Sequence, residues 1–222
     1  MSLLWFVAFY RYTEKALQWW SYRQSKHLFY EAENIRNDLL QESCAMRRML
    51  ESLLINEEGI SPKFSQDYLE KIEKIYHSLS ELSDRLAPIN CEYSLPLGIQ
   101  SLAALWCQKH PYLKINLEIP TDWRQESPEL NLVILQILNE LLQINLTHDL
   151  TKISISINLS LGNHLANLIV GISYPDKATL DSHAKCPNLA YLSKTFKVLT
   201  SGNCSRCRKN LTDIWYFQWS EV

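Results

Sequence analysis

Along the first half of the chain, apolar residues recur every three or four positions, which is the spacing of one face of a helix. This pattern covers residues 31–54 and again residues 64–86, with the stretch "NEEGISPKFS" between them. Gly59 and Pro62 in that stretch favour the end of one helix and a reversal of the chain. We therefore predict an antiparallel hairpin of two long amphipathic helices.

A single hairpin of this kind cannot bury all of its apolar side chains against itself. The common solution is a four-helix bundle made from two hairpins. The pattern in residues 31–86 therefore predicts a homodimer.

Beyond Pro88 the pattern changes, because helical periodicity now alternates with the two-residue period of strands. Ser127 and Pro128 are a typical N-cap and first position of a helix. We expect helices over 95–110, 127–148 and 187–203, and strands over 113–119, 152–161, 164–174 and 212–219. The predicted fold class is α+β: a helical hairpin domain with an aromatic N-terminal extension over 1–88, then a sandwich of one mixed sheet and one helix layer over 89–222.

The N-terminal extension carries aromatic residues at helical spacing: Trp5, Phe9, Tyr12 and Trp19. Its apolar run stops at Arg11, well short of the ~20 residues that a membrane-spanning helix needs. Three interpretations remain open for this stripe: a dimer or partner interface, a peripheral membrane contact, and packing within the chain. We expect the first and treat these four aromatic residues as partner-binding candidates.

Composition narrows the possible functions. Of the 222 residues, 46% are apolar and 21% charged, which is typical of a globular chain, and the net charge is −2. No basic field is present that would attract nucleic acid. Six scattered cysteines do not form a disulfide framework, and the start does not resemble a cleavable signal. We expect a protein of the reducing cytoplasm.

Two pairs of residues have the spacing of zinc ligands: His183 with Cys186, and Cys204 with Cys207. A predicted helix of about 15 residues, about 22 Å long, separates the pairs, which is too far for one tetrahedral site. We therefore expect no metal. Redox-active thiols and ordinary cysteines are the other interpretations.

Next to the second pair lies a basic cluster of Arg206, Arg208 and Lys209. The simplest interpretation of this cluster is a solvated loop. The alternative, functional interpretation is a docking site for an acidic partner.

The run "RNDLLQ" in the first hairpin helix and "ILNELLQINLTHDLTKISISINL" in the second half both resemble known sequence motifs. From about Glu31 to Trp219 the chain resembles the core of sensor histidine kinases of the nitrate-sensor and desaturase-thermosensor type, which has a dimerization hairpin and a GHKL-type ATP-binding domain. In that family the first helix carries a His-Asp-x-Leu-x-Gln motif. Here Arg36 stands at the histidine and Asn37 at the aspartate, while Gln41 is retained. A guanidinium is always protonated and cannot attack a phosphate.

The ATP-binding motif is also incomplete. Glu140 and His148 match the family's Glu-x-x-x-Asn-x-x-x-His segment, but Ile144 stands at the asparagine that binds Mg²⁺. An aliphatic side chain cannot coordinate this cation, and Asn145 is rotated about 100° around the helix. The family's Asp-x-Gly-x-Gly adenine loop is replaced by "SYPDKATLDSHAKCP". Asp176 in this stretch could still be the adenine contact, and the alternative is a solvated turn residue.

The resemblance therefore implies a pseudokinase with no nucleotide cofactor. It would act as a dimeric adaptor or regulator that binds a response regulator, a sensor kinase or another complex, and Arg36 is included among its partner-binding candidates. The alternative is a histidine phosphotransferase of a phosphorelay, which would use His27 or His77.

Overall fold

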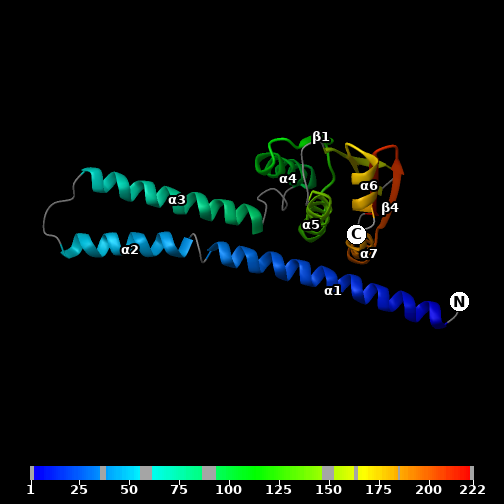
Figure 1. The fold of residues 1–222 in the computed structure, drawn as a ribbon, viewed down its shortest axis with the longest axis horizontal. Coiled ribbons are helices and arrows are strands. Elements are labelled where there is room, and N and C mark those ends of the chain that lie inside the picture. Colours follow the sequence, from blue (N-terminus) through cyan, green and yellow to red (C-terminus); the bar gives the residue numbers. More distant parts are fainter. Residues whose placement is uncertain are drawn as a thin grey trace. The chain divides into compact units, whose positions relative to one another are not determined.

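The computed structural model describes residues 3–35, 39–55, 62–86, 94–146, 153–162, 165–184 and 186–220. The chain divides into two compact units (Figure 1). Residues 22–88 form one unit, and residues 1–21 together with 89–222 form the other. The predicted domain boundary near residue 88 agrees with this division. The first 21 residues differ from the prediction, because they belong with the second domain and not with the hairpin.

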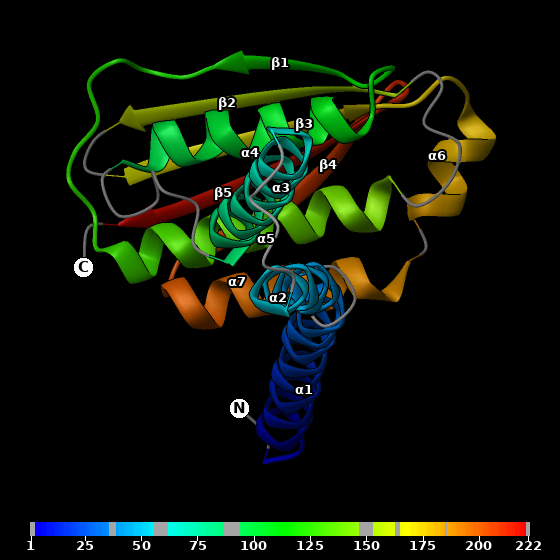
Figure 2. The same cartoon turned by 90° about the vertical axis from the view of Figure 1, so that its left-hand side faces the viewer.

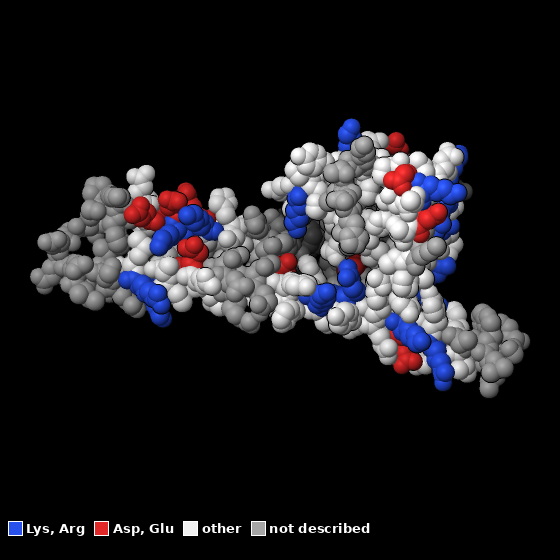
Figure 3. Space-filling view, in the orientation of Figure 1, with Lys and Arg blue, Asp and Glu red and all other residues white. Residues whose placement is uncertain are grey.

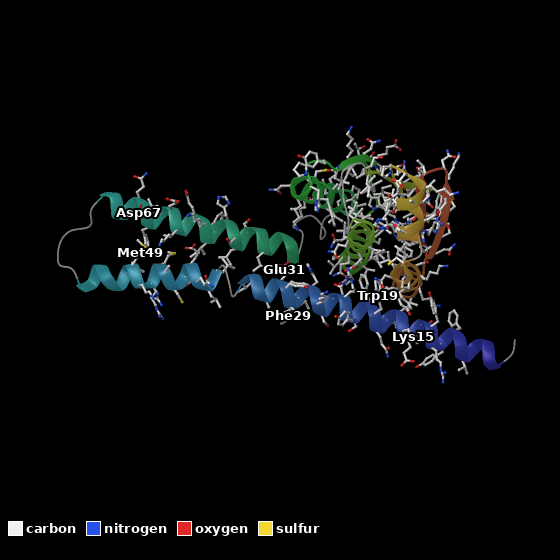
Figure 4. All side chains as sticks on the ribbon, in the orientation of Figure 1. Lys15, Trp19, Phe29, Glu31, Met49 and Asp67 are labelled. Carbon is white, nitrogen blue, oxygen red and sulfur yellow. The ribbon has the colours of Figure 1, made fainter. Side chains whose placement is uncertain are left out.

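The helical unit contains the predicted hairpin. It is formed by α2 (Leu40–Ile55) and α3 (Pro62–Leu86), which contact each other side by side, and it also includes the second half of α1 (Leu3–Asn34). The half-buried Met49 lies between α2 and α3, whereas Asp67 points away from α2 (Figure 4). The helical periodicity of 31–54 and 64–86 is therefore confirmed, although the first run spans the end of α1 and then α2.

The other unit is built on a five-stranded sheet in the order β1-β2-β3-β5-β4. The first pair is parallel and the remaining three are antiparallel, so the sheet is mixed as predicted. In the hairpin of β2 and β3, Gly162 pairs with Leu165. The strands are β1 (Lys114–Glu118), β2 (Ser154–Gly162), β3 (Leu165–Ser173), β4 (Asn203–Lys209) and β5 (Thr212–Ser220).

The helices of this unit cover one face of the sheet (Figure 2). They are α4 (Leu95–Lys109), α5 (Pro128–Asn145) and α7 (Pro187–Thr200), while the short α6 (Lys177–Ala184) lies at the end of the sheet. The α+β class with a single helix layer is therefore confirmed. The core between the layers includes Ile134, Leu138, Val170, Phe196 and Trp219, each with at most 1% of its surface exposed.

The first half of α1 packs on α7. Ala16 is completely buried, and its carbonyl oxygen accepts a hydrogen bond of 3.4 Å from the hydroxyl of Thr195. The rings of Tyr12 and Trp19 lie 5.8 and 6.1 Å from the ring of Tyr191. Figure 4 shows Trp19 on the side of α1 that faces α7. Two of the four aromatic residues, Tyr12 and Trp19, therefore contact α7 of the same chain, although Tyr12 and Phe9 keep 40% and 48% of their surface exposed.

The sequence prediction was wrong for two segments. Residues 203–209, interpreted as a loop with a basic cluster, form the edge strand β4. Only Cys204 in this strand is buried, so its sequence lacks the apolar alternation that marks a strand. The segment expected to be a loop after β3 contains α6. Its start is fixed by the local cap of Asp176 and not by apolar periodicity.

Helix α7 ends at a residue other than glycine. Ser201 adopts the left-handed conformation, with a φ angle of 53°, so it is the residue that reverses the backbone. At Gly202 an added Cβ would lie 2.3 Å from the carbonyl oxygen of Gln218. Gly202 is therefore required by the close approach of β5.

Candidate functional site

The resemblance in the sequence predicts a nucleotide site between the end of α5 and the end of β3. Helix α5 begins as predicted, since the hydroxyl of Ser127 accepts a hydrogen bond from the backbone N–H of Leu130. The apolar residues of α5 occur on most sides of the helix, and it is buried within its unit. This fixes the positions of Glu140, Ile144 and Asn145 near its C-terminal end.

Ile144 belongs to the hydrophobic core, with 8% of its surface exposed. Glu140, one turn earlier, is also buried. Ile144, which the resemblance aligns with a Mg²⁺-binding asparagine, therefore contributes to core packing and offers no oxygen.

Asn145 is completely buried, and both ends of its amide are engaged. Its nitrogen donates a hydrogen bond of 2.7 Å to the carbonyl of Leu141. Its oxygen accepts a hydrogen bond of 2.7 Å from the hydroxyl of Tyr174. The amide oxygen that could have replaced the missing ligand is therefore occupied by a side chain of the same protein.

Tyr174 is the first residue after β3, and its side chain is turned inward, so only 3% of its surface is exposed. Its backbone N–H donates to the carbonyl of Leu211, and its ring stacks on His183 of α6 with centroids 5.4 Å apart. Burial, and after it the nearby carboxylate of Asp213, raise the pKa of Tyr174 above its ordinary value. The phenol therefore stays protonated and acts as a donor to Asn145.

Asp213 lies next to this tyrosine and is completely buried. The guanidinium of Arg206 donates to both of its carboxylate oxygens, with Nε–Oδ1 and Nε–Oδ2 distances of 2.8 and 2.9 Å. The indole N–H of Trp215 donates to Oδ2 at 3.3 Å, and Arg206 also lies over the Trp215 ring, 4.8 Å from its centroid. A buried charge needs such partners to be tolerated.

Asp176 has a structural role at the start of α6. Its carboxylate accepts hydrogen bonds from the backbone N–H and the hydroxyl of Thr179, at 2.8 and 3.0 Å. The bond from the Thr179 N–H, followed by that from its hydroxyl, lowers the pKa of Asp176. This is helix capping by an ordinary turn residue.

The four metal-ligand candidates do not come together. Within the described ranges, no three His, Cys, Asp or Glu side chains form a group that could hold a metal ion. Cys204 and Cys207 lie three residues apart on β4 and therefore on opposite faces of the sheet, one buried and the other exposed. Burial raises the pKa of the Cys204 thiol to about 11, which disfavours the reactive thiolate.

Three of the predicted kinase positions lie outside the described residues: Arg36, Asn37 and His148. Gln41 is described and is exposed on α2. The side chain of Trp5 lies outside the described part. Phe9 remains 48% exposed, although the ammonium of Lys194 lies 3.4 Å from the centre of its ring.

The hairpin exposes a second apolar surface, which we call the α3 stripe: Leu69, Ile72, Tyr76 and Leu79. These residues are separated by three, four and three positions, so they lie on one side of the helix. A different side of α3 carries Tyr68, Ile75 and Leu82, which are buried or half-buried. On the part of α3 seen in Figure 3, charged side chains of both signs lie close together, and Glu70 and Lys74 form an exposed ion pair of 3.2 Å.

No protein-family model matches the sequence, and no curated protein sequence matches it. Several solved structures are similar. Histidine kinase AdeS of Acinetobacter baumannii aligns with a TM-score of 0.43 and 13% identity, over 83% of this chain and 97% of that one. A blue-light activated histidine kinase of Erythrobacter litoralis has a TM-score of 0.49 and 9% identity, over 82% of this chain and 58% of that one.

Histidine kinase ThkA, in its complex with the response regulator TrrA, has a TM-score of 0.48 and 16% identity, over 96% of this chain and 66% of that one. The chain is thus similar to histidine kinase cores, and at these identities the similarity concerns the fold alone. None of the described helices is both long enough and apolar enough to cross a membrane.

Two features of this region were missed by the sequence analysis. The sequence pattern places Tyr174 at the end of a predicted strand without a role for its side chain, and it does not connect Asp213 with Arg206. A signal for the second existed, because Asp213 opens a strand whose following alternate positions, Trp215, Phe217 and Trp219, are all apolar. An acidic residue on the buried face of a strand predicts a cationic partner.

Proposed function

We propose that this chain is a non-catalytic, histidine-kinase-like protein that acts as a dimeric protein-binding adaptor or regulator in two-component signalling. It would bind protein partners such as a response regulator or a sensor kinase. It would not transfer phosphate from ATP.

The hydrogen bond between Tyr174 and Asn145 is the observation that carries this proposal. In the family that the sequence resembles, the end of α5 supplies a metal ligand and the residues after β3 supply the adenine contact. Here one tyrosine joins these two elements, and Ile144 is part of the core. Mg·ATP would have to break a buried hydrogen bond and would find no oxygen at the metal position.

Phosphoryl transfer also needs a nucleophile held in line with the γ-phosphate. Arg36 stands at the position of the phosphoacceptor histidine in the resemblance. Its guanidinium has no free electron pair for attack, since it remains protonated. The loss of the nucleophile and the loss of the metal ligand therefore support the same proposal independently.

The α3 stripe supports the binding role. The exposed fractions of its four residues lie between 40% and 69%, whereas Tyr68, Ile75 and Leu82 on another side of α3 are buried or half-buried. Burying such side chains against a second hairpin contributes about 1.5–3 kcal/mol each before ordering costs are subtracted. We propose that the stripe forms a four-helix bundle with a second copy, leaving other surfaces of the bundle for a partner.

Nucleotide binding is the direct test. We expect isothermal titration of Mg·ATP into the full chain to give no binding up to about 1 mM, with an active sensor kinase as the positive control. Micromolar, Mg²⁺-dependent binding would contradict the proposal.

A restoration experiment sharpens this test. The double variant Arg36→His with Ile144→Asn returns the phosphoacceptor and the metal ligand, and we expect it to remain unphosphorylated by labelled ATP. Tyr174 still bonds to Asn145 in this variant, and the glycines of the adenine loop are still missing. Acid-labile phosphate on the variant would show that these two positions alone had inactivated the kinase.

The phosphotransferase alternative is favoured by one observation: His77 is exposed on α3, beside Tyr76 of the stripe. His27 on α1 is half-buried. A phosphorylated response regulator incubated with the chain would transfer phosphate to one of them. Loss of that label in His77→Gln or His27→Gln would identify the acceptor and replace the adaptor proposal.

A further inference from the structure

One face of the sheet carries no described helix. In Figure 2, α4, α5 and α7 all lie on the same side. The opposite face is formed by alternate residues of every strand, and apart from Gly171 these are half-buried or exposed. We call it the open sheet face.

The open sheet face is uncharged across its centre. Each of the three central strands β2, β3 and β5 contributes five outward positions, and none of the fifteen is acidic or basic. An average composition would place about three or four charged residues there. The outward residues are Ser154, Ser156, Asn158, Ser160 and Gly162 on β2; Leu165, Asn167, Ile169, Gly171 and Ser173 on β3; Thr212, Ile214, Tyr216, Gln218 and Ser220 on β5.

Polar side chains of this face hold one another in place. The amide of Gln218 donates to Asn167 at 2.8 Å, and the hydroxyls of Ser173 and Thr212 lie 2.8 Å apart. Hydroxyl and amide groups both donate and accept hydrogen bonds. A surface made of them can therefore bind another copy of itself, whereas a field of one charge sign could not.

Three larger side chains form the middle of the face. Ile169 and Tyr216 are register partners, and Ile214 lies on the same side two residues before Tyr216. All three are half-buried by their neighbours alone. An apolar centre within a polar surround is the usual arrangement of a protein interface.

We propose that the open sheet face binds the open sheet face of a second copy of this chain. A two-fold contact places the same residues on both sides, so it requires a surface that is complementary to itself. An uncharged surface of hydroxyl and amide groups meets that requirement. With strands about 4.8 Å apart and a rise of about 3.3 Å per residue, the five strands cover about 600 Å², the same order as the ~800 Å² per partner of a standard interface.

The charged side chains that point outward lie on the edge strands β1 and β4. Those of β1 fit the proposed two-fold contact. The outward side chains of β1 are Lys114, Asn116 and Glu118, so this strand begins with a positive charge and ends with a negative one. A two-fold axis across the strands would place Lys114 of one copy over Glu118 of the other. The remaining outward charge, Lys209, lies at the end of edge strand β4.

This contact is separate from the hairpin dimer proposed above. Two different two-fold contacts in one chain join more than two copies, and each contact can be removed without the other. Sedimentation analysis of the full chain at tens of micromolar therefore tests both. We expect the wild type to have at least the mass of a tetramer.

Ile214→Lys and Ser156→Lys each place a charge on the open sheet face, and the two-fold repeats that charge opposite itself. We expect both to raise the dissociation constant of this contact about tenfold or more and to leave a dimer. Leu97→Lys is the matched control, because Leu97 is 43% exposed on α4 and lies on the helix layer. It should leave the mass of the wild-type assembly unchanged.

The hairpin variant Leu79→Glu should also give a dimer, now held by the sheet, and Leu79→Glu with Ser156→Lys should give a monomer. A wild-type mass that neither sheet variant changes would overturn the sheet contact, even where Leu79→Glu still removes a hairpin dimer. A mass that only the sheet variants change would overturn the hairpin dimer and leave the sheet contact standing. A wild type that is monomeric at these concentrations would overturn both.

Discussion

The two units of this protein differ in how completely they bury their apolar side chains and pair their polar ones. In the sheet unit, Ile134, Leu138 and Trp219 are buried almost completely, and the buried Asp213 has cationic and indole partners. In the helical unit, Leu69 and Tyr76 on α3 keep 60% and 69% of their surface exposed. The sheet unit has the features of an independently folded domain, whereas α3 keeps large apolar side chains exposed.

The contrast between α5 and α3 explains this difference. Apolar residues occur on most sides of α5, and α5 is buried in the core of the sheet unit. On α3 they occupy a wide arc opposite a charged side that contains Glu70 and Lys74. One neighbour, α2, covers only part of that arc. The sequence of α3 is therefore suited to a bundle with more than two helices.

The largest expected effect on folding is at the buried ion pair. Asp213→Ala leaves Arg206 without its bidentate partner, so we expect the free energy of unfolding to fall by about 3–5 kcal/mol. Urea unfolding of the two proteins measures this. Asp176→Ala is the control, because it removes an exposed cap and should lower the free energy of unfolding much less. Equal losses in the two variants would show that the pair is not the main contribution.

The docking of the N-terminus should have the next largest effect. Ala16 is fully buried between α1 and α7, so Ala16→Arg must displace α1 or bury a charge, and we expect a loss of about 2–3 kcal/mol. Leu17→Arg, one residue away, changes a side chain that is 37% exposed and should lie within about 0.5 kcal/mol of the wild type. Two equally stable variants would place residues 1–21 outside the sheet unit.

A smaller effect is expected at Tyr174. Tyr174→Phe removes the hydrogen bond to Asn145, which should cost about 1–2 kcal/mol at neutral pH. Because the folded protein raises the pKa of this phenol, the stability that it contributes is fully present below the unfolded value of 10.0 and declines as the pH rises above it. The difference between wild type and variant should therefore shrink above pH 10. Unfolding curves at pH 7 and pH 11 measure the stability difference at neutral pH and its decrease at high pH. A difference that stays constant would contradict the role of the Tyr174 hydroxyl as the donor.

The smallest expected effect comes from a substitution that can be made in the same way in both units. Ile72→Ala, on the α3 stripe, should change the unfolding free energy of a dilute monomer by less than about 0.5 kcal/mol. Ile134→Ala makes the same chemical change at a fully buried position and should cost about 2–5 kcal/mol. A large loss for Ile72→Ala under dilute conditions would mean that the stripe is already buried within one chain.

Local patterns identified most of the secondary structure. The cap formed by Ser127, the strand periods on either side of Gly162 and the reversal between 54 and 64 each depend on a few adjacent residues. Strand β4 was missed because its seven residues contain only one buried side chain. Its strand conformation comes from pairing with β5, and an edge strand has no second neighbour that would demand apolar residues.

In the candidate site, too, some properties follow from single residues and others from the packing of distant elements. The sequence alone determined that Ile144 cannot bind a metal and that Arg36 cannot be a phosphoacceptor, because these conclusions follow from the chemistry of single side chains. Only the tertiary structure decided that Tyr174 bonds to Asn145, 29 residues away, and that Thr195 meets Ala16 across 179 residues. Contacts between residues so far apart depend on how the elements pack. No local pattern encodes them, so the bond between Tyr174 and Asn145 and the docked N-terminal helix became visible only in the folded chain.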